Sequence, residues 1–237
     1  MRTGPRRSRH ESAAIMIPDA YYLMTRGYTR SARYFNGRFA ETRESIAALG
    51  ASSPWATKRF AVVWRGTPTS DASGGRHRLV TLAAELRDRG RFTAQQVDID
   101  WAPRNCSHAS PYGGCERYLS PAEMVQSRGI ISVDGVANEW TLPWKLLSNS
   151  VLLLVQSARA WEWYYPSLVP WKHFVPIRND FSDLEQAISF VLDPKNDDAL
   201  QAIATASTEL MLAMNITSSA HAIRPQLQAA FGMSERA

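Results

Sequence analysis

The chain has 237 residues, of which 45% are hydrophobic and 21% are charged, and this is enough apolar material for one large domain. No run of about 18 apolar residues is present, so the sequence predicts no transmembrane helix, and the first residues lack the apolar segment of a secretory signal. The net charge is +5, and much of it lies in the arginine-rich first ten residues, so we predict no nucleic-acid-binding surface.

The predicted organisation is one folded unit between two tails. Residues 1–14 form a basic, disordered tail, residues 15–225 form a single α/β domain, and residues 226–237 form a second tail. Near the start of the domain, Asp19 either caps a helix or lies at the edge of a cleft. Residues 29–49 then show the apolar spacing of a helix.

A strand, a polar loop and an amphipathic helix are predicted next. Residues 60–64 are the apolar strand, residues 67–75 are rich in Thr, Ser, Pro and Gly, and residues 76–87 have one apolar face. This arrangement commonly holds a phosphate, because main-chain amides at the start of the helix point at the ligand. Arg65 at the end of the strand either binds a diphosphate through its planar guanidinium or forms an ordinary salt bridge.

Two cysteines, Cys106 and Cys115, lie in a Ser-, Pro- and Gly-rich loop. The loop follows a predicted strand at residues 92–99 and precedes a short helix, for which Ser120 and Glu123 have the spacing of a capping box. A disulfide and two separate thiols are equally compatible with this spacing, and a disulfide would indicate an oxidising compartment. Two cysteines with only His108 nearby do not have the spacing of a zinc site, so we predict no metal.

Residues 129–155 predict a strand, a sharp turn, a short helix and a second strand. Asn138 is the expected cap of a helix over residues 140–147, and residues 151–155 are entirely apolar. Two strands joined by a short helix indicate a parallel sheet, whose ligands lie beyond the carboxyl ends of the strands. The residues expected in that position, at a helix start suited to a phosphate, are Asp134, Gly135, Val136, Ala137 and Asn138.

The last third of the chain predicts one strand and two helices. The strand covers residues 171–176, and the helices cover residues 182–191 and 196–215. Glu162 stands among aromatic residues, where a carboxylate needs partners. His173 is a candidate acid or base, and its simpler interpretation is a structural histidine.

Five blocks of sequence carry a resemblance to a known family. They are Trp-Arg-Gly-Thr-Pro-Thr-Ser at residues 64–70, Val-Asp-Gly-Val-Ala-Asn at 133–138, Lys-Leu-Leu-Ser-Asn-Ser at 145–150, Glu-Trp-Tyr-Tyr-Pro at 162–166, and Leu-Val-Pro-Trp-Lys-His-Phe-Val-Pro at 168–176. In order and spacing they resemble glycosyltransferase family 90. That family includes the protein O-glucosyltransferases and the capsule-associated, CAP10-type sugar transferases.

The resemblance implies a Rossmann-like sheet that forms the nucleotide-binding half of a GT-B-type enzyme, with the N-terminal acceptor domain largely missing. The implied reaction transfers glucose or xylose from a UDP-sugar to a hydroxyl of a protein or glycan, with inversion. The UDP-sugar is the donor substrate, and no cofactor is implied. The implied nucleotide-sugar site consists of Arg65, Gly66, Thr67, Thr69, Ser70, one of Arg76 and Arg78, the residues Asp134, Gly135, Val136, Ala137 and Asn138, and Glu162.

Several points stay open within this resemblance. Glu162 either binds the ribose hydroxyls or is a charge at a helix N-terminus or facing solvent. No residue matches the catalytic Asp that animal protein O-glucosyltransferases carry upstream, so the base is unknown, and Asp19 is a candidate as the only early acid in a recognisable block. Thr141 stands where those enzymes have an Arg. Three functions stay possible, which are an active transferase, a non-catalytic UDP-sugar-binding module and a partner-binding domain. The expected location is the secretory lumen in a eukaryote and the cytoplasm in a bacterium.

Overall fold

The computed structural model describes most of the predicted α/β domain. The described residues are 39–68, 74–101, 119–135, 139, 141–156, 162–214, 224 and 228. Asp19, Cys106 and Cys115 lie outside them, as do the predicted N-terminal tail and most of the C-terminal tail. The predictions that rest on those residues therefore stay predictions.

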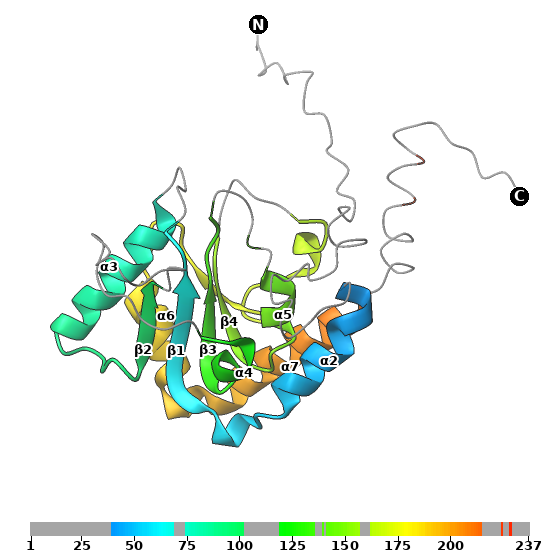
Figure 1. The fold of residues 1–237 in the computed structure, drawn as a ribbon, viewed down its shortest axis with the longest axis horizontal. Helices are drawn as coiled ribbons and strands as arrows, with labels where there is room; N and C mark the ends of the chain where they lie inside the picture. The colour runs from blue at the N-terminus through cyan, green and yellow to red at the C-terminus, as the bar shows by residue number, and fades with distance from the viewer. Residues whose placement is uncertain are drawn as a thin grey trace, which may run out of the picture.

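A five-stranded sheet of order β2-β1-β3-β4-β5 forms the centre of the molecule (Figure 1). The strands are β1 (Arg59–Gly66), β2 (Val97–Trp101), β3 (Ser127–Ser132), β4 (Val151–Val155) and β5 (Val175–Ile177). Every neighbouring pair is parallel, as the sequence predicted. All five strands therefore end at the same edge of the sheet, which is the edge where ligands of such sheets bind.

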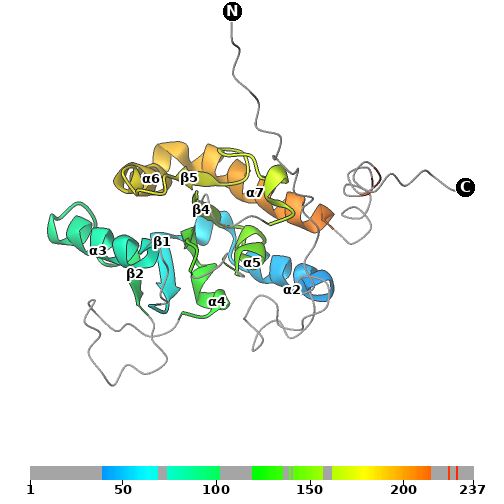
Figure 2. The same ribbon diagram turned by 90° about the horizontal axis from the view of Figure 1, so that it is seen from above.

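Helices pack on both faces of the sheet (Figure 2). They are α2 (Phe39–Ala51), α3 (Gly75–Asp88), α4 (Pro121–Met124), α5 (Leu142–Leu146), α6 (Leu184–Leu192) and α7 (Asp197–Ala213). Helices α3 and α6 contribute to one apolar core, α2, α4 and α5 contribute to the other, and α7 reaches both. Along β1, Val62 and Trp64 enter the first core while Ala61 and Val63 enter the second, which is the alternation of a strand buried on both faces.

Local sequence signals account for several boundaries. The predicted capping box at the start of α4 is confirmed: Glu123 N–H donates to Ser120 Oγ at 3.3 Å, and Ser120 N–H donates to Glu123 Oε2 at 2.8 Å. Strand β4 has the predicted bounds, because its residues form a continuous apolar run. The described part of the chain contains no helix with the length and apolar character that a membrane span requires.

Three elements differ from the prediction. Strand β5 begins at Val175 rather than residue 171, because Trp171 has a φ of +63° and lies in a turn closed by Trp171 N–H donating to Phe174 O at 2.8 Å. Strand β2 begins at Val97, after a turn in which Val97 N–H donates to Thr93 O. Helix α5 begins at Leu142 with Thr141 in the cap position, rather than at residue 140 with Asn138 as its cap.

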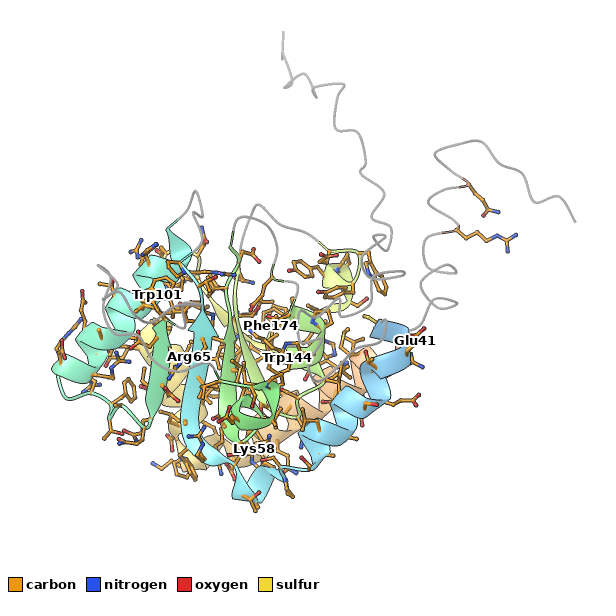
Figure 3. All side chains as sticks on the ribbon, viewed as in Figure 1. Glu41, Lys58, Arg65, Trp101, Trp144 and Phe174 are labelled. Atoms are coloured by element: carbon orange, nitrogen blue, oxygen red, sulfur yellow. The ribbon has the colours of Figure 1, made fainter. Side chains whose placement is uncertain are left out.

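The amino-terminal edge of the sheet holds a buried lysine. Lys58 Nζ donates to the carbonyl of Val125 and to Ser150 Oγ, the latter at 3.1 Å. Ser150 Oγ in turn donates to Ser127 O at 2.8 Å, so the amine is held where β3 and β4 begin. Burial lowers the pKa of Lys58 to about 8. Figure 3 places Lys58 at the end of the sheet opposite to the ends of the strands where ligands bind.

Candidate functional site

The strand order places a topological switch point between β1 and β3. The chain leaves β1 toward α3, which packs on one face of the sheet, and leaves β3 toward α5, which packs on the other. Ligands of open parallel sheets bind where neighbouring connections diverge in this way. We use the term switch point for residues 65–67 at the end of β1 together with residues 133–135 after β3. The sequence-predicted site residues Arg65, Gly66, Thr67, Asp134 and Gly135 all lie here.

Arg76 spans the switch point from the first turn of α3. Its Nη1 donates to Thr67 O at 3.3 Å, and its Nε donates to Asp134 O at 3.3 Å. The guanidinium also lies 6.0 Å from the ring centroid of Trp64. A half-buried cation is thus fixed between the ends of the two central strands.

The structure also distinguishes Arg76 from Arg78, which the sequence could not do. Residues that are two positions apart in a helix are separated by about 200° around its axis, so Arg76 and Arg78 face nearly opposite directions. Arg76 turns toward the ends of the strands, whereas Arg78 is exposed. Of the two arginines, only Arg76 therefore lies at the switch point.

The guanidinium of Arg65 is buried and bound to Asp98, whereas binding of a diphosphate would need its N–H groups to face the ligand. Its Nη1 donates to Asp98 O at 2.8 Å, its Nη2 lies 2.5 Å from Asp98 Oδ1, and only 4% of its side chain is exposed. Asp98 is paired in register with Val63, so the guanidinium folds back along the sheet, away from the switch point. The salt-bridge interpretation of Arg65 is therefore present in this structure, and its role toward a diphosphate stays a prediction.

Gly66 is required by packing at the end of β1. A Cβ at this position would lie 2.7 Å from Cη2 of Trp64, whose ring is buried and contacts Trp101 edge to face at 5.6 Å. The small residue thus lets the chain pass over the tryptophan before it turns into the loop. The remaining predicted residues of the two loops, which are Thr69, Ser70, Val136, Ala137 and Asn138, lie outside the described residues.

Asp134 links the two sides of the switch point. Its Oδ1 accepts a hydrogen bond from the main-chain N–H of Glu139 at 3.0 Å, and its carbonyl accepts from Arg76. The side chain of Asp134 therefore closes the turn that precedes α5, while its main chain holds the cation from α3.

A buried ion pair that the sequence analysis missed lies directly beside this turn. Lys145 Nζ is 2.5 Å from Glu139 Oε1, and the two side chains are 4% and 10% exposed. Glu139 also accepts hydrogen bonds from Ser132 Oγ, from Val133 N–H at 3.1 Å and from Thr141 Oγ1 at 2.5 Å. Both carboxylate oxygens are thereby satisfied, as a buried charge requires.

The two charges support each other electrostatically. Burial raises the pKa of Glu139, but the charge of Lys145 and hydrogen bonds from Lys145, Ser132 and Thr141 outweigh it, so the pKa is lowered overall. Glu139 is therefore a carboxylate at neutral pH. Burial lowers the pKa of Lys145, the charge of Glu139 opposes this, and the charge of Arg76 lowers the pKa further. The charge of Arg76 at the switch point therefore acts on the buried pair of Glu139 and Lys145.

No periodic signal in the sequence reveals this pair. Glu139 and Lys145 are six residues apart, and Glu139 precedes the helix, so the spacing of helical ion pairs does not apply. The only local signal is a lysine inside the otherwise apolar segment 142–147. A lysine there requires an anionic or carbonyl partner, and the structure supplies both, since Lys145 Nζ also donates to Ile131 O at 2.8 Å.

Glu162 and His173 are both buried. Glu162 is 5% exposed, which is incompatible with the solvent-facing interpretation, and its carbonyl accepts a hydrogen bond from Tyr165 N–H at 3.0 Å. Its contact with a ribose stays a prediction. His173 accepts a hydrogen bond from Val169 N–H on Nδ1 at 2.9 Å, and burial lowers its pKa. His173 therefore holds the turn before β5, as the structural interpretation predicted.

The chain is similar in sequence to known proteins. The family model described as glycosyl transferase family 90 matches residues 8–218. The chain is 27% identical over 221 residues to the uncharacterized protein 027R of Frog virus 3 (isolate Goorha), a match that covers 84% of the chain and 22% of the viral protein. It is 30% identical over 172 residues to the O-glucosyltransferase rumi homolog of Aedes aegypti, covering 71% of the chain and 40% of that protein.

A third relative is the human protein O-glucosyltransferase 1. It is 25% identical over 176 residues, which are 74% of the chain and 42% of the human protein. The matches thus span less than half the length of each of these relatives. Because the family model matches most of this chain, the chain belongs to glycosyl transferase family 90.

Proposed function

We propose that this chain is the donor-binding part of a GT-B-type glycosyltransferase, which transfers glucose or xylose from a UDP-sugar to a hydroxyl of a protein or glycan. The observation that carries the proposal is the position of Arg76, a cation fixed between the ends of β1 and β3 at the switch point. Two relatives whose names include O-glucosyltransferase support the choice of reaction.

The chemistry of this transfer explains why a cation is needed there. The bond between the sugar anomeric carbon and the diphosphate oxygen breaks, and its electron pair leaves with UDP. The acceptor oxygen bonds to the anomeric carbon from the opposite side, which inverts the configuration, and its proton passes to a base. Cations that are already in position stabilise the charge that develops on the diphosphate. Arg76 is the described residue best placed for this role, with Thr69, Ser70 and residues 136–138 proposed to complete the phosphate contacts.

The second candidate function is UDP-sugar binding without transfer. Asp134 and Glu139, the carboxylates described at and beside the switch point, both accept hydrogen bonds from this chain. The pKa of Glu139 is also lowered, which makes it a poor proton acceptor. In the proposal of an active enzyme the base lies elsewhere, and Asp19 remains the candidate. Measuring UDP release from UDP-glucose with and without hydroxyl acceptors separates the two functions.

Calorimetric titration with UDP, followed by UDP-glucose and UDP-xylose, tests the donor site. We expect binding by the wild-type chain and an affinity lower by about tenfold or more in Arg76→Ala, because a charge-assisted phosphate contact is lost. Arg78→Ala is the matched control, since Arg78 lies on the same helix but is exposed. No UDP binding by the wild-type chain, or equal losses in both variants, would overturn the proposal.

A further inference from the structure

A continuous chain of hydrogen bonds runs from α5 to α3 across the switch point. Lys145 Nζ donates to Glu139, and the main-chain N–H of Glu139 donates to Asp134 Oδ1. The carbonyl of Asp134 accepts from Arg76 Nε, and Arg76 Nη1 donates to Thr67 O. The buried pair is therefore connected to the cation proposed for the donor phosphates through a single intervening residue.

The pair also joins this chain to the sheet itself. Glu139 accepts from Ser132 Oγ and Val133 N–H at the end of β3, and Lys145 donates to Ile131 O in the same strand. The carboxylate is thus fixed on one side by β3 and on the other by Thr141 and Lys145 next to and within α5. As a result, the main-chain N–H that holds Asp134 has a defined position relative to the sheet.

A purely structural role does not explain why these side chains are charged. Replacing a buried ion pair by apolar residues of similar volume is often neutral or stabilising, because both charges lose hydration when they are buried. The other residues of α5 are apolar and buried, so an apolar side chain at position 145 is compatible with its packing. What the apolar pair lacks is the set of directed hydrogen bonds that orients the turn.

We infer that Glu139 and Lys145 are positioning residues for the phosphate part of the donor. They act through Asp134 and Arg76 and do not touch the ligand. The inference rests on the proposed function, since it needs a phosphate-bearing ligand at the switch point. It predicts that removing the pair weakens binding of the phosphates while binding of the nucleoside is retained.

The test uses the double variant Glu139→Leu/Lys145→Met in the full chain. Both replacements are close in size to the original side chains and leave no unpaired buried charge, but they remove the acceptor of Ser132 Oγ, Val133 N–H and Thr141 Oγ1, so we expect thermal stability below that of the wild type. Thermal unfolding is therefore measured first, and binding is titrated at a temperature where the variant is folded. Affinities for UDP, pyrophosphate and uridine are measured by direct titration or by competition with UDP. We expect UDP and pyrophosphate affinities to fall by about tenfold or more and the uridine affinity to stay within about twofold.

Lys58→Met provides the matched control. It removes another buried lysine, but at the opposite edge of the sheet, where Lys58 is bound to Val125 O and Ser150 Oγ. We expect its UDP, pyrophosphate and uridine affinities to equal those of the wild type. A general effect of losing a buried amine would instead lower the affinities in both variants.

The outcomes separate the inference from the proposed function. A folded double variant with wild-type affinities, or one that loses uridine and pyrophosphate equally, overturns the positioning role and leaves the donor site standing. Absence of UDP binding in the wild-type chain overturns the proposed function and the inference together. If the double variant does not fold, Glu139→Gln, which keeps the size of the side chain and removes its charge, is measured with the same ligands. Equal affinities in that variant overturn the inference.

Discussion

Arg65 is bound to Asp98 on the neighbouring strand, with Nη2 2.5 Å from the carboxylate Oδ1 and Nη1 2.8 Å from the carbonyl. Because Asp98 lies opposite Val63 in the register of β1 and β2, this pair directs the guanidinium back along the sheet. A donor phosphate that recruits Arg65 must therefore compete with Asp98 for the same donor groups.

Replacement of Asp98 by Asn tests this competition. If Arg65 binds the diphosphate, Asp98→Asn is expected to raise UDP affinity roughly threefold to tenfold. The reason is that the guanidinium of Arg65 then does not have to break an ion pair before it binds the phosphate. Titration with UDP is the measurement, and Asp100→Asn on the same strand is the control. Unchanged or weaker binding in Asp98→Asn, together with wild-type binding in Arg65→Ala, would assign Arg65 to the fold alone.

Replacement of Gly66 by Ala is expected to destabilise the end of β1. The new Cβ would lie 2.7 Å from Cη2 of Trp64, which is too close for either group to keep its place. Overpacking of this kind costs about 1–3 kcal/mol, measured as the loss in urea unfolding free energy. A shift in tryptophan fluorescence should accompany it. Gly90→Ala, which is strained by its φ of +67° but has no atom within 4 Å of its Cβ, should leave the fluorescence unchanged. Full stability of Gly66→Ala would contradict the packing argument.

The pH dependence of stability should report on Lys58. Its pKa is lowered from 10.5 to about 8 in the folded state, so between these two values the unfolded chain binds more protons than the folded one. Stability contributed by this site therefore rises as pH increases from about 8 to 10.5 and is absent below that window. Comparing urea unfolding of the wild type and Lys58→Met at pH values near 7.5 and 10 measures it. An identical pH dependence in the two proteins would contradict the prediction.

Glu139 should give a response of the same sign, but at acid pH. Its folded-state pKa is lowered, so its contribution to stability is complete above the ordinary glutamate pKa of about 4.3 and is lost as pH falls through the folded-state pKa. Glu139→Gln resembles the protonated acid, and at neutral pH it should be less stable by about 3 kcal/mol. Thermal unfolding at several pH values should show this difference shrinking below about pH 4. A difference that is constant with pH would mean that charge at this position does not stabilise the fold.

Much of the fold followed from the sequence alone. Strand β4 has the predicted bounds and α4 begins at the predicted capping box, because each signal depends on neighbouring residues only. The succession of strands and helices determined a parallel sheet, since parallel neighbours need crossover connections. The same pattern placed the turn after β3 at the edge where ligands bind, and the family resemblance agrees with the match over residues 8–218.

Only the tertiary structure decided how the charged residues at this edge are used. The binding of Arg65 to Asp98 depends on the register of β1 and β2, and the choice of Arg76 over Arg78 depends on how α3 is oriented on the sheet. The pair of Glu139 and Lys145 forms because the turn brings a residue outside the helix against one inside it. Local periodicity carries no information on contacts between different strands and helices, because those contacts are set by how the packed elements are placed in space.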